Sequence, residues 1–396
     1  MSTVSEVVIV SAVRTAVGSF GGSLKDVEPC KLGELVIAES IRRAGIEASD
    51  VGHVVLGNVI HTEARDMYIS RVAALNAGVP KEAPALTVNR LCGSGIQAIV
   101  SAAQSVMLGD AAVAVAGGAE SMSRSGHLLP NMRWGQRLGD GAAIDMMLGA
   151  LHDPFGHGHM GITAENVADR YGISREQQDA FALASHTRAT SAIEAGHFDS
   201  QILTVEVKNR RQVVEFKEDE HVRKDATIDD MTKLRPAFKA DGGSVTAGNA
   251  SGLNDGAAAL VLMSKPEAER RGLKPMARIL GYAHAGVEPS EMGIGPVPAV
   301  KKLLQRTGLT TADIDLFESN EAFAAQACAV NKELGLSEDK VNVNGGAVAL
   351  GHPIGATGAI ISTKLLYELQ RTGKQHGIAT MCIGGGQGIA LAVEAI

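Results

Sequence analysis

Short continuous apolar runs alternate along the chain with longer segments in which apolar residues recur about every three or four positions. The continuous runs are typical of buried strands, and the periodic segments are typical of amphipathic helices. We expect strands at Val7–Val10, His53–Leu56, Ala112–Ala116, Ala277–Leu280, Ile314–Glu318 and Gly377–Ile383, and helices at Leu32–Arg43, Ser70–Asn76, Ile96–Leu108, Ala299–Thr307, Ala322–Leu334 and Gly358–Gln370. This alternation predicts an α/β protein whose mostly parallel sheets are covered by helices on both faces.

The two ends of the chain resemble each other. Landmarks recur in the same order: Ala44–Asn58 with Thr307–Asn320, the helical segments after Cys92 and His352, and the glycines at Gly117-Gly118 with those at Gly384–Gly386. The offset is about 260 residues, and each copy is longer than about 100 residues, which indicates two similar α/β domains and not a solenoid.

The segment between the copies has a different composition. It is rich in Met, His, Arg and Pro as far as Met160, and a capping box at Ser174 opens a helix that Gly196 ends. Insertions of this size in α/β enzymes usually cover an active site or form a subunit interface. We therefore expect an N-terminal half at residues 1–119 and 250–272, an inserted loop domain at residues 120–249 and a C-terminal half at residues 273–396.

Composition narrows the class of protein further. A chain of 396 residues can form two or three domains with substantial cores. The net charge of −7 does not favour binding to the negatively charged backbone of nucleic acid. No apolar run approaches the roughly 18 residues of a membrane helix. The chain runs from Met1 into a strand without a signal-peptide pattern. Its four cysteines are scattered and form no CxxC pair, so we expect a reducing cytoplasm.

Cys92 lies at the start of an apolar helical segment, in Asn89–Ile96. The positive end of a helix dipole lowers a thiol pKa from about 8.5 toward neutrality. Gly93 and Gly95 would let the backbone and a bulky acyl group come close. An arbitrary cysteine is more often a buried core residue, but the Cys-Gly-Ser-Gly turn between strand and helix favours a nucleophile.

His352 and Cys382 each lie in a glycine-rich turn. Pro353 restricts His352 to extended conformations and so presents the imidazole rigidly. A phosphate-cradling loop is the rival interpretation, but no Gly-Lys-Ser/Thr ending is present. Cys382 ends a strand before Gly384–Gly386, whose N–H groups can form an oxyanion hole, and a dinucleotide fingerprint fits the spacing poorly. Two thiols and one imidazole suit carbon–carbon bond chemistry on a thioester.

Two polar segments have less specific patterns. Asn320 lies where a strand ends and a helix begins, so it could cap the helix, orient a catalytic water, or do both. His152, His157 and His159 share a glycine-rich loop without helical spacing, so we expect the lining of a polar cleft and no metal site.

Taken together and in this order, these motifs resemble the thiolases, in particular the bacterial short-chain acetyl-CoA acetyltransferases (β-ketothiolases). The resemblance covers essentially the whole chain and rests on Asn89–Gly95, Gly117–Ser123, His159–Asn166, Thr246–Gly252, Asn320–Ala324, the His352 loop and the Cys382 turn. It implies a thiolase-type fold: two duplicated α/β domains with mixed, mostly parallel sheets, layered α-β-α-β-α, plus an inserted loop domain. Members of this type are commonly homotetramers, as dimers of dimers.

The resemblance also implies the roles of individual residues. Cys92 would form the acyl-enzyme, with His352 taking its proton, and Cys382 would act as acid and base at the α-carbon of the second thioester. One oxyanion would meet the N–H groups of Cys92 and Gly384, and the other would meet His352 and a water held by Asn320.

The implied substrates are acyl-CoA thioesters, and no metal or redox cofactor is expected. The CoA-binding residues would be Ser251, His159, Met160, Arg223, Ala322 and Phe323. Acetoacetyl-CoA is the default β-ketoacyl substrate, and a five-carbon β-ketoacyl-CoA would also fit. Decarboxylating ketoacyl synthases share the duplicated fold but use His/His or His/Asn pairs, so a second thiol disfavours them. A non-catalytic CoA-thioester-binding subunit would need neither thiol.

Overall fold

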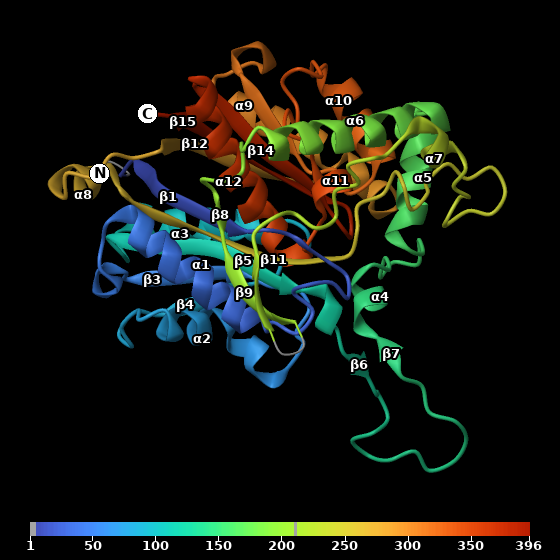
Figure 1. The fold of residues 1–396 in the computed structure, drawn as a ribbon, viewed down its shortest axis with the longest axis horizontal. Coiled ribbons are helices and arrows are strands. Elements are labelled where there is room, and N and C mark those ends of the chain that lie inside the picture. Colours follow the sequence, from blue (N-terminus) through green and yellow to red (C-terminus); the bar gives the residue numbers. More distant parts are fainter. Residues whose placement is uncertain (1–4, 210–211) are drawn as a thin grey trace.

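A computed structural model describes residues 5–209 and 212–396. Its elements alternate between strands and helices, as the sequence predicts (Figure 1). The strands are β1 (Val7–Thr15), β2 (Gly18–Ser19), β3 (His53–Gly57), β4 (Ala85–Val88), β5 (Val113–Ser121), β6 (His127–Leu128), β7 (Ile144–Asp145), β8 (Ile202–Leu203), β9 (Val205–Asn209), β10 (Gln212–Phe216), β11 (Asn254–Ser264), β12 (Ala277–Gly286), β13 (Leu316–Ser319), β14 (His376–Ile383) and β15 (Gln387–Ala395). The α-helices are α1 (Pro29–Ala44), α2 (Ile69–Asn76), α3 (Ser94–Leu108), α4 (Met146–Ala150), α5 (Met160–Tyr171), α6 (Arg175–Glu194), α7 (Ile228–Thr232), α8 (Lys265–Arg270), α9 (Pro296–Thr307), α10 (Ala324–Leu334), α11 (Ala347–Leu350) and α12 (Ile354–Thr372).

The two halves of the large sheet have the same strand order. In the first half the order is β4-β3-β5-β11-β1, and only β11 runs against the other strands. In the second half the order is β13-β14-β15-β12, and only β15 runs against its neighbours. A parallel bridge from Phe317 to Val341 occupies the place that β4 has in the first half. The predicted duplication is therefore visible in the topology, and each half-sheet is mixed with most strands in one direction.

Helices form three layers around the two half-sheets. The central layer contains α3 and α12, which contact each other and the strands on either side. The outer layers are α1 with α2 on the N-terminal half, and α9 with α10 on the C-terminal half. The half-sheets meet edge to edge, where Val8 and Ile9 of β1 pair with Arg278 and Ala277 of β12. This is the predicted α-β-α-β-α arrangement.

The central helix α3 corrects one expectation from the sequence. Over Leu91–Leu108 its mean hydropathy reaches 1.4 across 18 residues, so by length and composition alone this segment could cross a membrane. The sequence-based statement that no apolar run approaches this length is therefore wrong. In the fold, α3 is apolar because it lies in the central layer, where it packs against α12, β3 and β5.

The segment between β5 and β11 holds α4 to α7 and two small hairpins (Figure 1). The first hairpin pairs β6 with β7, and the long loop between these two strands forms an arm that projects away from the sheets (Figure 1). A buried ion pair, Arg14 Nη1 to Asp219 Oδ1 at 2.7 Å, ties the loop after β10 to β1. The segment is also held to the core by the pairing of β8 with β1 and by contacts of α5 and α6 with α10, whereas the arm projects away from the sheets (Figure 1).

Candidate active site

Cys92 is positioned by a strained turn between β4 and α3. Asn89 Oδ1 accepts a hydrogen bond from the Leu91 N–H at 2.9 Å, and the Ser94 hydroxyl donates to the Leu91 carbonyl at 2.6 Å. Leu91 has φ +45°, a left-handed conformation that is uncommon for a non-glycine residue. The turn therefore fixes Cys92 directly before Gly93, the N-cap of α3.

The glycines after Cys92 serve packing between the two halves and not the acyl group. A Cβ on Gly93 would lie 3.1 Å from Ile383 Cγ1, and a Cβ on Gly95 would lie 2.9 Å from the Cα of Gly358 on α12. The expectation that these glycines make room for an acyl group is therefore wrong. Their role is to let α3 approach β14 and α12 closely.

Burial outweighs the helix N-terminus in setting the acidity of Cys92. Burial raises the pKa of Cys92 to about 11, whereas the backbone N–H groups of Gly384 and of Cys92 itself act in the opposite direction. The predicted shift toward neutrality is thus wrong, because the loss of hydration is the larger effect. The thiol is protonated near pH 7 and needs a base to become a nucleophile.

His352 is the base that the pocket offers. It lies in the turn before α12, where Gly351 has φ +104°, and its backbone N–H donates to Asn254 Oδ1 at 2.9 Å. Burial lowers the pKa of His352 to about 4, so the imidazole is neutral near pH 7. Its Nε2 atom is buried and has no hydrogen-bond partner among the described residues.

Cys382 is the last residue but one of β14 and is fully buried. Its pKa is raised far above the usual range, first by burial and second by the neighbouring Cys92. The following turn passes through Gly385 and Gly386, both with positive φ, and brings the Gly384 N–H to the Cys92 sulfur. A thiol with a raised pKa is a proton donor and not a second nucleophile.

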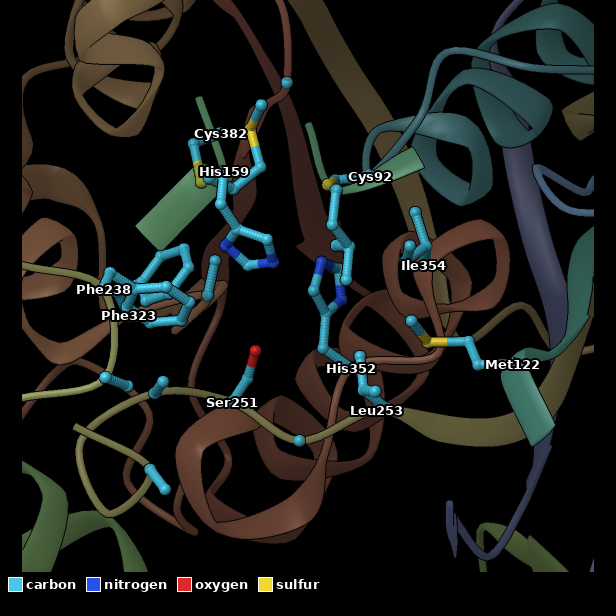
Figure 2. Close-up of a pocket in the computed structure, with 18 of the residues that line it drawn as sticks. Cys92, Met122, His159, Phe238, Ser251, Leu253, Phe323, His352, Ile354 and Cys382 are labelled. Atoms are coloured by element: carbon cyan, nitrogen blue, oxygen red, sulfur yellow. The ribbon is translucent and has the colours of Figure 1, made fainter. Parts of the chain in front are cut away.

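These groups face one cavity of about 350 Å³ (Figure 2). The predicted site residues that line it are Cys92, His352, Cys382, Gly384, Ser251, His159, Met160, Ala322 and Phe323. Lining residues to which the sequence analysis assigned no role include Met122, Leu148, Leu151, Phe238, Thr246, Leu253 and Ile354. Met292 also lines the cavity, as expected from the sequence of the Met-containing segment Glu291–Gly295. The structure therefore brings together the residues of both halves and of the inserted segment.

The two sides of the cavity differ in chemistry (Figure 2). On one side the His159 ring stacks on Phe238 with centroids 4.7 Å apart, and Phe238 meets Phe323 edge to face. His159 Nδ1 accepts the Gly161 N–H at 3.0 Å, so the proton of a neutral ring is on Nε2. On the other side Met122 and its neighbours form an aliphatic wall, with Leu253 and Ile354, beside Cys92.

Asn320 and Arg223 lie outside this cavity. Asn320 is buried and lines a small separate cavity, and neither side-chain amide atom has a partner among the described residues. It does not cap α10, whose N-cap is Phe323, so the capping interpretation is wrong. Arg223 borders a different hollow with Lys224 and Leu234. The roles of Asn320 with water and of Arg223 with CoA stay predictions.

The histidine loop contains no cluster of ligands for a metal. The rings of His152 and His159 meet edge to face with centroids 5.3 Å apart. Over residues 5–209 and 212–396, no group of three His, Cys, Asp or Glu side chains is placed to hold an ion.

Glu120 is a site-supporting residue to which the sequence analysis assigned no role. Its buried carboxylate accepts the N–H groups of Val59 at 3.0 Å, Ile60 at 3.1 Å and Gly355 at 2.8 Å. It thereby ties the loop after β3 to the His352 turn of the other half. The only signal in the sequence is its place in Gly117–Ser123, because the partners are remote along the chain.

Comparisons with known proteins agree with this architecture. Residues 7–266 match the profile described as thiolase, N-terminal domain, and residues 273–395 match thiolase, C-terminal domain. The chain is 65% identical over 391 residues to the beta-ketothiolase BktB of Cupriavidus necator, covering 99% of each chain. It is 52% identical over 396 residues to the acetyl-CoA acetyltransferase of Syntrophomonas wolfei, again covering 99% of each.

Solved structures give the same result. The acetyl-CoA acetyltransferase of Bacillus anthracis superposes with a TM-score of 0.98 at 51% identity and covers 100% of both chains. Human mitochondrial 3-ketoacyl-CoA thiolase in complex with CoA superposes with a TM-score of 0.96 at 42% identity, covering 99% of this chain and 98% of that one.

Proposed function

Because the chain belongs to the thiolase family, we propose that it is an acetyl-CoA C-acetyltransferase, a β-ketothiolase that works through an acyl group on Cys92. It cleaves a β-ketoacyl-CoA with free CoA, and in reverse it condenses acetyl-CoA with a second short acyl-CoA. The observation that carries this proposal is one cavity lined by Cys92, His352, Cys382 and Gly384.

The first half of the cleavage reaction uses His352, Cys92 and Cys382 in turn. His352 Nε2 takes the proton of Cys92, and the thiolate attacks the keto carbon of the substrate. The resulting oxyanion accepts the N–H groups of Cys92 and Gly384. The carbon–carbon bond then breaks, and Cys382, protonated because of its raised pKa, donates its proton to the departing acetyl-CoA carbanion.

The second half returns the enzyme to its starting state. Free CoA loses its thiol proton to the Cys382 thiolate and attacks the acyl-Cys92 thioester, and the released Cys92 thiolate regains its proton from His352. In our proposal the enolate oxygen of acetyl-CoA is stabilised by the protonated His352 and by a water that Asn320 holds. The unpartnered amide of Asn320 supports this role.

The two sides of the cavity support different parts of the substrate. We propose that the pantetheine arm of CoA lies along Ser251, His159 and Phe323, and that the nucleotide end reaches toward Arg223. The binding of CoA to the human mitochondrial thiolase of the same fold supports a CoA thioester as substrate. The acyl group on Cys92 would lie against the aliphatic wall, which suits acetoacetyl-CoA and a five-carbon β-ketoacyl-CoA.

Three further properties remain part of the proposal. No metal or redox cofactor is needed, because the thiols, the imidazole, the backbone N–H groups and the water held by Asn320 supply every proton transfer and oxyanion contact in the proposed mechanism. The free thiols of Cys92 and Cys382 suit a reducing cytoplasm. The protein would be a homotetramer, a dimer of dimers, and the apolar arm between β6 and β7 supports this assembly.

Cleavage assays on matched cysteine variants test the function. Wild type, Cys92→Ser and Cys382→Ser are compared with acetoacetyl-CoA and 3-ketovaleryl-CoA in the presence of CoA, with Cys328→Ser as a control outside the cavity. We expect turnover by wild type and the control, and a loss of at least about 1,000-fold in both site variants. Near-normal turnover by Cys382→Ser would refute the proton transfer, and binding of CoA esters without cleavage by wild type would favour a binding subunit.

A further inference from the structure

The ring of His352 makes one hydrogen bond, and that bond decides which nitrogen is the base. Its Nδ1 atom lies 2.7 Å from the Oγ1 atom of Thr357, in the first turn of α12. The opposite nitrogen, Nε2, has no partner among the described residues, and the side chain lines the cavity that Cys92 also lines. Base catalysis on Cys92 therefore requires a lone pair on Nε2.

Thr357 has one hydroxyl hydrogen and two close neighbours. Besides its contact with the imidazole, Oγ1 lies 2.9 Å from the carbonyl oxygen of Pro353. A carbonyl has no hydrogen to donate, so the hydroxyl hydrogen belongs to that contact. The hydrogen between Thr357 and His352 must then be the one on Nδ1.

A neutral imidazole has one N–H proton, so placing that proton on Nδ1 of His352 also determines that Nε2 carries the lone pair. Burial lowers the pKa of His352 to about 4, so near pH 7 the ring carries one proton on one of its two nitrogens. With the proton on Nδ1, the lone pair is on Nε2 and faces the cavity. With the proton on Nε2, the ring could donate to Cys92 but could not accept its proton.

We propose that Thr357 is a positioning residue: it holds neutral His352 in the tautomer with the proton on Nδ1, so that Nε2 can accept the Cys92 proton. The inference rests on the proposed function for the roles of Cys92 and His352. During transfer the proton leaves the Cys92 sulfur and binds Nε2, while Thr357 keeps its own proton and accepts from Nδ1 throughout. His159 has the opposite tautomer, so the cavity contains one imidazole that accepts a proton and one that donates a hydrogen bond.

Thr357→Val tests this inference because valine keeps the shape and removes the acceptor. Without an acceptor for the Nδ1 proton, we expect kcat for acetoacetyl-CoA cleavage to fall on the order of 100-fold, with KM changed by less than about twofold. Alkylation of Cys92 by iodoacetamide should slow about 10-fold at the same pH, since less thiolate forms. Thr357→Ser, which keeps the hydroxyl, should restore kcat to within about threefold of wild type.

Thr363 provides the matched control on the same helix. Its buried hydroxyl donates to the Ala359 carbonyl at 2.9 Å, four residues back, as Thr357 does to Pro353. Thr363→Val should lower the melting temperature as much as Thr357→Val but leave the alkylation rate of Cys92 unchanged. If Thr357→Val and Thr363→Val changed the alkylation rate of Cys92 equally, the role of Thr357 would be only structural, and the inference would be wrong.

Nitrogen NMR of ¹⁵N-histidine-labelled enzyme gives an independent readout. The His352 signals, identified by their absence in His352→Asn, should report a protonated Nδ1 in wild type and a shift toward protonated Nε2 in Thr357→Val. A wild-type ring protonated on Nε2 would refute the inference even if activity fell. Failure of the proposed function is a distinct result, because wild type would then not cleave acetoacetyl-CoA at all.

Discussion

The acid–base behaviour of the site depends on His352 being buried. Burial lowers its pKa to about 4 from an ordinary 6.5, so the base form persists as the pH falls below neutrality. We expect the acid limb of the pH profile of kcat/KM for acetoacetyl-CoA cleavage to lie near pH 4 and not near pH 6.5. An acid limb near pH 6.5 would mean that the free enzyme keeps His352 hydrated.

The same shift affects stability, so the profile needs a control. Because the folded state binds this proton less readily than the unfolded state, His352 makes the protein less stable as the pH drops from 6.5 toward about 4. Melting temperatures recorded at each pH separate loss of the base from unfolding. A fall of activity that tracks the melting temperature would leave the expected acid limb without support.

The sequence predicts the chemistry of a residue only where the neighbouring residues in the chain determine it. Cys92, His352 and Cys382 each lie in a turn whose glycines are adjacent in sequence, and all three line one cavity. The acidity of Cys92 was predicted in the wrong direction, because the burial that raises its pKa comes from residues remote in sequence, and it outweighs the backbone N–H groups of Cys92 and Gly384 that lower the pKa. The proposed role of Thr357 could not be predicted, because it depends on the two hydrogen bonds of its hydroxyl group, to His352 and to Pro353, and these follow from the three-dimensional structure.

At the scale of elements, the crossing of α3 and α12 depends on two facing glycines. A Cβ added to Gly95 would lie 2.9 Å from the Gly358 Cα, and no flexible side chain is there to yield. We expect Gly95→Ala to destabilise the protein by about 1–3 kcal/mol, measured by thermal or urea unfolding. Gly149→Ala is the control in α4, where a Cβ meets nothing within 4 Å.

The control should shift stability in the opposite direction. In open space, alanine in place of a helical glycine restricts the unfolded chain and stabilises by about 0.4–1 kcal/mol. If Gly95→Ala were also neutral or stabilising, the two central helices would have room to separate, and the close crossing would not be what fixes them.

The central strand β11 was missed although it contains the continuous apolar run Ala257–Met263. Most predicted elements are present within a few residues, and α10 begins at Ala324 where Ala322 was expected. The strand β11 was not predicted, although it joins β1 to β5 at the centre of its half-sheet. Its partners are far away in the chain, and no local pattern indicates that it runs against them.

At the scale of the whole molecule, the arm between β6 and β7 carries several exposed apolar side chains. The arm exposes Trp134 at 91% and Leu138 at 90% of their surfaces, together with Leu129 and Met132, and a group of exposed apolar side chains marks an interaction site more often than a single one does. The sequence predicted an inserted segment that covers the site or contacts another subunit. Met160 of α5 lines the cavity, so the segment does cover the site, and a contact with another subunit stays a prediction. We expect the arm to be the surface on which the proposed tetramer depends.

Charge placed on the arm should separate the tetramer into dimers. In Trp134→Asp with Leu138→Asp, a buried carboxylate at each contact would oppose the association of the two dimers. We expect the mass from light scattering after gel filtration to fall about twofold, with the wild-type circular dichroism spectrum retained. Leu108→Asp, at another exposed apolar residue, at the end of α3, is the control and should stay tetrameric. If the arm variant kept the wild-type mass, the subunits would associate through another surface, and the arm would need a different partner.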